Sequence, residues 1–430
     1  MKKEYPSLSE TVFWNTLPNG LTVAVVPRPG FQRKLAYFVT DFGSVHTSFS
    51  FEGKDHTVPA GIAHFLEHKM FDLPGRDVMA EFAELGANVN AFTSYDMTAY
   101  YFSCTEHFEE SLRLLVEFVS TPYFPAESVQ KEMGIIDQEI GMTADTPDSR
   151  VFEDLMAAMY ARHPIRVPIL GNSDSIREIT PETLTLCHNA FYAPGNMILC
   201  VVGDVSPESV CSIAREILGD TPRPVGKKAP FPREDMTTAD APGRQMEVSM
   251  PMFQLGFKCE CAPLGEASIR QEILGDLAAE ALFGESSELY LKLYEDGIID
   301  SSFGGGFESV DGCALLTCGG DSDHPEKIRD ALLLQVEKLC REGIPEQDFL
   351  RMKRSALGRR IRDLDSFDAT AFRLCAYHMC KYDYFGFPGV YASVTGAEVL
   401  EFLKQVIRKE RCSLSVIRPF EETKAGGAFS

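Results

Sequence analysis

The chain has 430 residues, of which 44% are hydrophobic and 24% charged, and its formal net charge at pH 7 is −22. These values are typical of a soluble globular protein of two or more domains, and they exclude a disordered or fibrous chain. The longest apolar runs, such as Met197 to Val202, fall far short of the roughly 20 residues of a membrane helix, so we expect no membrane partner. The negative charge argues against nucleic acid as a partner, because phosphates require a basic surface. It could instead favour basic peptide substrates through long-range attraction, or serve solubility alone.

The N-terminus and the cysteines indicate a location. Met1 to Pro6 is charged and no apolar segment follows it, so we expect no secretory signal. Twelve cysteines in a chain of this size predict reduced, scattered thiols and a cytoplasmic protein. Cys375, His378 and Cys380 lie close enough in sequence to raise a second metal site. Because no matching cluster with zinc-finger spacing accompanies them, we favour buried structural residues over ligands.

Strands and helices are mixed in the N-terminal half. The β-branched run Leu21 to Val26 follows the turn pair Asn19-Gly20, which predicts a strand. Thr57 as cap and Pro59 in the first turn predict a helix over Thr57–Phe71, stopped near Pro74-Gly75. Periodicity and stop signals predict the remaining elements. These are a helix at Arg76–Leu85 ended by Gly86, strands at Ala87–Phe92 and Met97–Cys104, and helices at Phe108–Val119 and Pro125–Met142.

A proline-rich segment divides the chain. Thr221 to Gly243 carries five prolines among charged and small residues: Pro222, Pro224, Pro230, Pro232 and Pro242. Proline removes backbone donors and stiffens a segment, and little apolar surface is available there to bury. We therefore predict one domain at residues 1–221, a linker at 222–243 and a second domain at 244–430.

The C-terminal half repeats the mixture of the first. We predict strands within Met246–Cys259 and Ser302–Cys318, and helices at Ala267–Phe283, Pro325–Glu342 and Pro345–Leu364. Strands mixed with paired helices in both halves suggest an α+β fold of two related domains. No residue-level repeat proves a duplication.

The sequence His64-Phe65-Leu66-Glu67-His68 lies in the first predicted helix. Residues four apart share one face of a helix, so both imidazoles can reach the same metal ion. Glu67 lies on that face as well, beside the metal, and can serve as a general base. Because a pattern with three fixed positions is not rare by chance, the metal site needs a third ligand.

The helix predicted at Pro125–Met142 offers that ligand. Glu132 and Glu139 are seven residues apart, along one border of the buried stripe of this amphipathic helix. Two carboxylates beside a buried face are costly unless something positive faces them. A zinc ion held by two histidines would meet that need. A solvated acidic edge is the alternative, and would be the better interpretation without the histidine motif.

These motifs resemble the pitrilysin/insulinase family of zinc peptidases, the inverzincins, which include the mitochondrial processing peptidases. The resemblance does not depend on the metal motif alone. Other segments resemble the family's opening strand, its active-site strand and the last strand region of its first domain. They are Leu17–Leu21, Ala87–Ser94, and Phe191–Met197 with Val202–Asp204. The matches span the N-terminal half in order and at sensible spacing.

The resemblance implies a zinc metalloendopeptidase. His64, His68 and Glu139 would bind Zn²⁺, Glu67 would be the base, and Glu132 would be a supporting carboxylate. In the implied mechanism, zinc acidifies its water and polarises the scissile carbonyl, while Glu67 takes the proton and passes it to the leaving amine.

The resemblance also implies a fold and a mode of substrate binding. Two similar α+β domains, each a mixed or antiparallel sheet packed with helices, would form half of a clam-like chamber, and the second domain would lack the metal motif. Asn90, Ala91 and Phe92 would lie on an edge strand that pairs with the substrate backbone. Peptide capture by strand addition has this character. An ordinary core strand is the alternative.

One feature of the family is missing. Active members carry, in the second domain or in a partner, an arginine followed seven residues later by a tyrosine. In the matching segment Ser287–Asp300, Tyr294 stands at the place of the arginine, and Asp300 or Ser301 at that of the tyrosine. Because such a pair contributes strongly to the rate, we expect this chain to be the zinc-bearing half of a heterodimer. A related sister subunit would supply the pair, as in a paired bacterial type of the family that these motifs most resemble; a homodimer is the weaker expectation.

Two other functions are compatible with the resemblance. A non-catalytic scaffold subunit would be expected to lose part of the zinc motif, whose residues are all present. A chaperone-like peptide-binding subunit would use the chamber and the edge strand, but it would need no general base, and Glu67 is intact.

Overall fold

The computed structural model describes residues 1–234, 236 and 239–420. A seven-stranded sheet organises the N-terminal half, with the spatial order β1-β2-β3-β11-β4-β10-β9. All neighbouring strands are antiparallel except β3 and β11. The strands are β1 Lys2–Tyr5, β2 Glu10–Thr16, β3 Thr22–Pro27, β4 Lys34–Thr40, β9 Asn88–Thr93, β10 Thr98–Cys104 and β11 Met197–Gly203. Strand β9 therefore lies at one edge, with β10 as its neighbour in the sheet.

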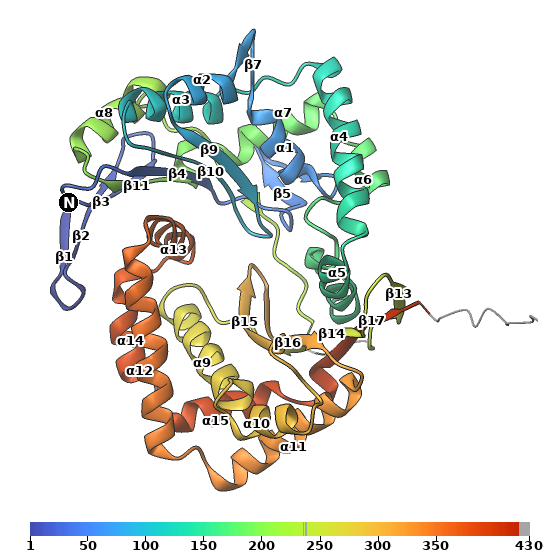
Figure 1. Cartoon of the computed structure of the whole chain (residues 1–430). Helices are drawn as coiled ribbons and strands as arrows, with labels where there is room; N and C mark the ends of the chain where they lie inside the picture. Colours follow the sequence, from blue (N-terminus) through green and yellow to red (C-terminus); the bar gives the residue numbers. More distant parts are fainter. Residues whose placement is uncertain (235, 237–238, 421–430) are drawn as a thin grey trace, which may run out of the picture.

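Helices cover one face of this sheet, as the upper part of Figure 1 shows. The helices of the N-terminal half are α1 Ile62–Met70, α2 Val78–Glu84, α3 Phe108–Ser120, α4 Ala126–Ala144, α5 Pro147–Met159, α6 Ser173–Arg177, α7 Pro181–Phe191 and α8 Pro207–Leu218. Apolar side chains of the sheet and helices form one core between them. Short pairings complete this half: β5 Ser48–Phe51 with β6 Lys54–Thr57 and β12 Lys227–Lys228, and β7 Asp72–Leu73 with β8 Arg76–Asp77.

A five-stranded sheet organises the C-terminal half, in the order β13-β17-β14-β16-β15. Its strands are β13 Arg244–Met246, β14 Met252–Cys259, β15 Gly304–Val310, β16 Cys313–Asp321 and β17 Cys412–Pro419. The helices are α9 Glu266–Phe283, α10 Glu288–Glu295, α11 Pro325–Glu342, α12 Glu346–Arg362, α13 Phe367–Met379, α14 Phe387–Ser393 and α15 Gly396–Val406. Two mixed sheets packed with helices confirm the predicted α+β fold of two domains.

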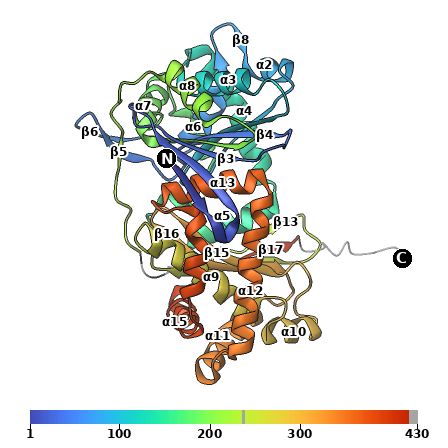
Figure 2. The same cartoon turned by 90° about the vertical axis from the view of Figure 1, so that its left-hand side faces the viewer.

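Each half sends a helix into the other. Helix α13 packs against β4 and β11 of the first sheet, on the face opposite α2, α3 and α8, and α5 packs against β14 and β17 of the second. Helix α13 also reaches β2, where the ring of His378 on the helix lies 6.0 Å from that of Trp14 on the strand. Figure 2 shows α13 and α5 between the two sheets. Apolar residues of both halves consequently form one continuous core.

The described residues of the proline-rich segment follow the surface of both halves and are held there. Residues Lys227 and Lys228 form β12, and the carboxylate of Glu234 accepts backbone N–H bonds from Ala161, Arg162 and His163 at 2.7–3.0 Å. The ring of Phe231 lies 4.5 Å from that of His163. Phe231 is thus partly buried, whereas Val225 and Met236 of the same segment are exposed. The domain limits at residues 221 and 244 stay a prediction.

The helix that carries the His64–His68 motif begins later than predicted. Helix α1 starts at Ile62 and not at Thr57, because Thr57 belongs to β6, where it pairs with Ser48. Gly61 precedes the helix at a φ of 89°, and a Cβ there would meet the carbonyl oxygen of Leu170 at 2.4 Å. A close backbone approach therefore decides where this helix starts, and the sequence pattern does not show it.

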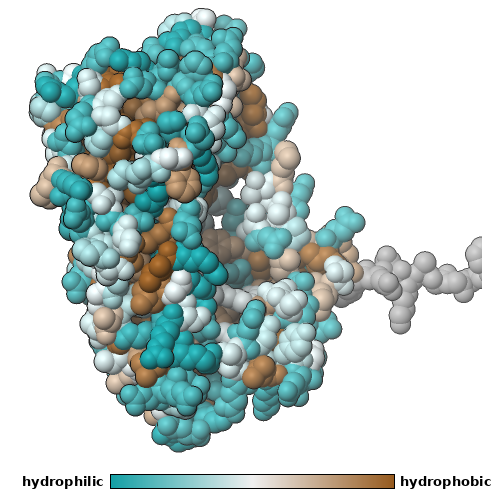
Figure 3. All heavy atoms as spheres, turned by 60° about the vertical axis from the view of Figure 1, so that its left-hand side comes forward, coloured by the Kyte–Doolittle hydropathy of each residue, from teal (hydrophilic) through white to brown (hydrophobic). Residues whose placement is uncertain are grey.

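The other predicted elements are found within a few residues of their expected limits. The helix predicted at Arg76–Leu85 is shorter, because Asp77 caps α2 by accepting the N–H of Ala80 at 3.0 Å. Most of the surface in Figure 3 is hydrophilic, with apolar side chains in separate small groups. Within the residues described, no helix combines the length and apolarity that crossing a bilayer requires.

Candidate metal centre

Helix α1 carries four polar side chains in an otherwise apolar sequence, and three of them belong to the metal motif. Ile62, Phe65 and Leu66 are buried in the core of the first half, which fixes the rotation of the helix. His64, Glu67 and His68 then lie toward α4 and β9, which both contact α1. His64 and Glu67 are almost fully buried, at 7% and 9% exposure. His64 and Glu67 thus sit in a water-poor position that the helix itself orients, whereas His68 is partly exposed.

Helix α4 brings Glu139 to the two histidines. Glu139 Oε1 lies 3.7 Å from His64 Nε2, and Glu139 Oε2 lies 3.7 Å from His68 Nε2. One ligand atom from each residue falls within 4.8 Å of the others, and no second such group of His, Cys, Asp or Glu occurs among the described residues. Two ligands bound about 2.1 Å from one zinc ion at a tetrahedral angle would be about 3.4 Å apart. The separations and the two-nitrogen, one-oxygen donor set therefore fit zinc.

Glu132 lies one step behind the ligands. Its Oε1 is 3.0 Å from Nδ1 of His68, so it holds the ring with Nε2 directed at Glu139. A carboxylate on the outer nitrogen fixes the imidazole tautomer and makes the inner nitrogen a better ligand. This contact is compatible with the supporting role that the resemblance implies for Glu132, and that role stays a prediction.

The two imidazoles differ in their electrostatic surroundings. Burial, with a smaller contribution from the nearby His68, lowers the pKa of His64 to about 3, so this ring is in the neutral form that a metal needs. Burial also lowers the pKa of His68, but the hydrogen bond to Glu132 and the charges of Glu67, Glu132 and Glu139 outweigh it and raise the pKa overall. The carboxylates around His68 thus stabilise a positive charge at this position. A bound metal ion can supply that charge in place of the proton.

Glu67 has a partner that the sequence reasoning missed. Thr93 Oγ1 donates to Glu67 Oε2 at 2.7 Å, from the last residue of β9. Burial raises the pKa of Glu67, and the hydrogen bond from Thr93 acts in the opposite direction. Thr93 stands in the segment that resembles the family's active-site strand, and its alternation with Ala91 is the signal that could have placed it on the helix-facing side.

The three predicted substrate-binding residues lie on β9. Ala91 packs against the helix-side core, whereas Asn90 is exposed and Phe92 packs against the core that includes α13. The Phe92 ring lies 5.9 Å from that of Phe372 on α13. The backbone N–H of Ala91 donates to Asn90 Oδ1 at 2.8 Å. This strand is at the edge of the sheet, as expected, but its role in substrate binding stays a prediction.

The remaining predicted features lie away from the metal group. Tyr294 is on α10, 53% exposed, and its ring stacks on Tyr290 at 6.0 Å. Asp300 accepts hydrogen bonds from the backbone and hydroxyl of Ser302. Cys375 is fully buried on α13, and His378 stacks on Trp14, so both take part in packing; their role as structural residues stays a prediction.

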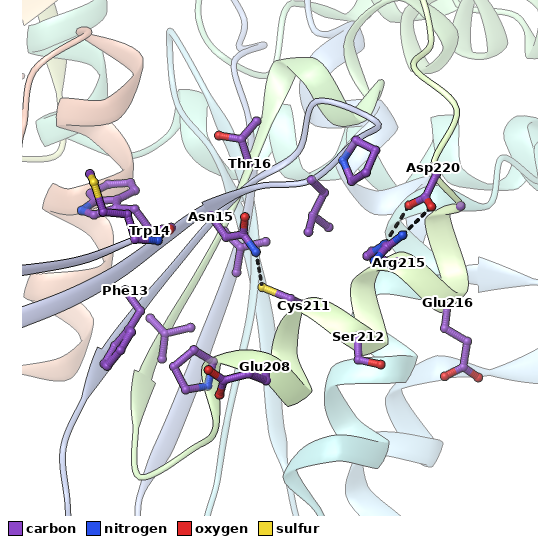
Figure 4. A pocket seen from close by; sticks show the side chains of 17 residues that line it. Phe13, Trp14, Asn15, Thr16, Glu208, Cys211, Ser212, Arg215, Glu216 and Asp220 are labelled. Carbon is purple, nitrogen blue, oxygen red and sulfur yellow. Dashed lines mark hydrogen bonds and ion pairs between the residues drawn. The ribbon is translucent and has the colours of Figure 1, made fainter.

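A groove of about 820 Å³ between β2 and α8 is distinct from the metal group. Figure 4 shows Asn15 directed at Cys211, and Arg215 paired with Asp220. Phe13 and the strand residues Val23 and Val25 also line it. Arg215 of the groove is already paired with Asp220, and none of the proposed metal ligands is among the described residues that line the groove. The groove is therefore not the candidate site.

Comparison with known proteins gives a consistent picture. The family described as Insulinase (Peptidase family M16) matches residues 53–173, and the one described as Peptidase M16 inactive domain matches residues 178–356. The protein named "Uncharacterized zinc protease YmfH" of Bacillus subtilis (strain 168) is 35% identical over 97% of this chain and 98% of its own length. The Mitochondrial-processing peptidase subunit beta of Caenorhabditis elegans is 30% identical, over 48% of this chain and 44% of its own.

A crystal structure supports the same relationship. The M16-like peptidase from Alicyclobacillus acidocaldarius superimposes with a TM-score of 0.92, at 31% identity, covering 98% of this chain and all of that one. The fold is therefore shared over nearly the whole length of both proteins.

Proposed function

The chain belongs to the insulinase family of peptidases, family M16, and on this premise we propose that it is the zinc-bearing subunit of a heterodimeric endopeptidase. Zinc is the cofactor, because several relatives are zinc proteases by name. The observation that carries the proposal is the convergence of His64, His68 and Glu139 within 4.8 Å of one another, beside a buried carboxylate.

The residues around the metal group suit peptide hydrolysis. Bound at His64, His68 and Glu139, zinc would supply a Lewis acid and leave one coordination position open. Glu67 accepts the proton of the attacking water at its carboxylate and delivers it to the leaving amine. Thr93 occupies one oxygen of Glu67, so the other is left for the water. Burial of Glu67 raises its pKa, which makes it a stronger base than an exposed carboxylate.

Strand β9 would bind the substrate. Its outer edge offers backbone groups to an extended peptide, and main-chain hydrogen bonds give affinity with little sequence preference. The Ala91 N–H now bonds to Asn90 Oδ1, a local contact that a substrate carbonyl can replace. The substrates that fit this mode are peptides and small unfolded polypeptides, held in a clam-like chamber of which this chain forms one half.

The sister subunit completes the site. Tyr294 is exposed on α10 and cannot act as the arginine of the family's pair, and Asp300 is occupied by Ser302. A related chain that carries the arginine and tyrosine would supply them across the chamber. The similarity to a subunit of the mitochondrial processing peptidase supports a paired assembly, and a homodimer would lack the pair in both halves.

The decisive experiment compares peptidase activity of the chain alone, of its sister alone and of the mixture. We expect strong cleavage of an unstructured peptide only by the mixture, with loss of activity in the Glu67→Gln variant. Strong activity of this chain alone would refute the heterodimer. The scaffold or peptide-binding subunit would be favoured by two results together. The mixture would be inactive and contain no zinc, and cells that carry the Glu67→Gln variant would keep the function of the protein.

We also place the protein in the cytoplasm. All twelve cysteines are free thiols, most of them buried, as expected of a protein kept in a reducing compartment.

A further inference from the structure

Helix α4 is held by few apolar contacts for its length. It has 19 residues, yet only Val129 and Ile136 are buried, with Met133 and Ile140 partly buried beside them. Its packing partners include α1, α5 and α6. Because so little apolar surface fixes it, polar contacts must contribute to the position of α4, and that position decides whether Glu139 can reach the histidines.

Polar contacts join α4 and α1 at three successive levels. At the metal level, Glu139 faces His64 and His68. One level on, Glu132 contacts the outer nitrogen of His68. At the third level, Ser128 contacts Lys69 with 2.5 Å between Oγ and Nζ. Ser128, Glu132 and Glu139 are spaced by four and seven residues, so they lie along one line of the helix.

Lys69 is the unusual member of this series. Its residue is 1% exposed and its side chain has no accessible surface, although it carries an ammonium group. The ammonium is bound by the carboxylate of Asp72 and by Ser128, and the Ser128 hydroxyl lies 2.5 Å from Asp72 Oδ2. A buried ammonium is costly unless its partners are correctly placed, so it favours the one arrangement of α1 and α4 that satisfies it.

We propose that Lys69, Asp72 and Ser128 form a polar clamp that positions α4 against α1 and thereby sets the affinity of the metal centre for zinc. Lys69 is a positioning residue, because it acts through α4 and does not contact the ligand atoms. The inference rests on the proposed zinc site, but it is independent of peptidase activity and of any partner.

The test measures zinc binding to the full chain by competition with a chromophoric chelator, and the unfolding temperature of the zinc-free form by calorimetry. Lys69→Met keeps much of the volume and removes the charge. We expect it to weaken zinc binding about tenfold or more, comparable to the loss of other groups that orient ligands. Lys353→Met is the matched control, because the ammonium of Lys353 is bound by the carbonyl oxygens of Ala392 and Val394, on elements of the other domain.

A second pair of variants covers the case in which Lys69→Met does not fold. Ser128→Ala removes only a hydroxyl and should weaken zinc binding about fivefold, whereas Ser128→Thr keeps the hydroxyl and should restore it. Zinc affinity unchanged in Ser128→Ala, or in a folded Lys69→Met, would overturn the clamp even if the unfolding temperature fell. Absence of stoichiometric zinc in the wild type would instead contradict the proposed function, so the two failures can be told apart.

Discussion

The hydroxyl of Thr93 donates to the carboxylate of Glu67 with 2.7 Å between Oγ1 and Oε2, which joins the edge strand β9 to the helix that carries the metal motif. One residue pair thus connects the strand proposed to bind substrate with the base proposed to act on it. Strand β9 contacts the same helix, and Ala91 packs against the core that the helix shares. If the strand binds substrate as proposed, this hydrogen bond would connect substrate binding to the position of Glu67.

The first prediction concerns this pair. Thr93→Val keeps the shape of the side chain and removes the hydroxyl donor, so the charged carboxylate of Glu67 loses the hydrogen bond that it accepts from Thr93. We expect kcat of the active complex to fall roughly tenfold to a hundredfold, with KM little changed. Thr93→Ser should keep most of the rate. In the Glu67→Gln background, Thr93→Val should have no further effect, and additive losses would show that Thr93 acts elsewhere.

The second prediction separates ligand from supporting carboxylate. Glu139→Gln should abolish stoichiometric zinc, because an amide oxygen is a poor substitute for a carboxylate at zinc. Glu132→Gln should lower the affinity about tenfold to a hundredfold while retaining the stoichiometry. Metal analysis and chelator competition measure both. Glu127→Gln, at an exposed position in the first turn of the same helix, is the control and should bind zinc like the wild type.

A third prediction tests strand addition at β9. Peptides that are methylated at single backbone nitrogens should bind the zinc-loaded Glu67→Gln form in an alternating pattern. Methylation of a nitrogen that faces the strand should weaken binding about fivefold, and methylation of its neighbour should not. Binding can be measured by fluorescence anisotropy in the complex with the sister subunit. A uniform effect at every position would exclude pairing with an edge strand.

The metal group could be predicted from the sequence because its geometry is local. His64 and His68 share a helix face by spacing alone, and Glu132 and Glu139 share another for the same reason. Only the meeting of the two helices had to be inferred, and the resemblance to the family supplied it. The structure brings His64, His68 and Glu139 within 4.8 Å of one another, and their role as metal ligands stays a prediction.

Features that depend on tertiary contacts could not be predicted in this way. Lys69 continues the apolar face of Ile62 and Phe65 at helical spacing, but a lysine is rarely fully buried, and its partner Ser128 lies on another helix that the spacing does not show. The start of α1 at Ile62 depends on the approach of Gly61 to Leu170 from a distant loop. The exchange of α5 and α13 between the halves joins residues that are distant in the sequence, so no local pattern records it.

The fourth prediction concerns the junction of the two halves and its dependence on pH. Asp311 lies in the turn between β15 and β16, and its carboxylate is 3.0 Å from His46 Nε2 and 3.0 Å from Lys228 Nζ. Burial alone would raise the pKa of Asp311, but the hydrogen bonds and charges of His46 and Lys228 outweigh burial and lower it well below its usual range. Asp311 thus connects the second sheet to the first half and to the linker.

The sign of the effect follows from this shift. A carboxyl group whose pKa is lower in the folded state stabilises the fold above its unfolded pKa of about 3.9, and that contribution is lost as the pH falls below it. Asp311→Asn should therefore lower the free energy of unfolding by roughly 1–3 kcal/mol at pH 7. Denaturant unfolding should show this difference between wild type and variant shrinking as the pH is lowered from 5 toward 2. Asp323→Asn, at an exposed position, is the control and should leave the free energy of unfolding almost unchanged at any pH. If the difference in unfolding free energy between Asp311→Asn and the wild type stays constant with pH, the charge of Asp311 is not what joins the two halves.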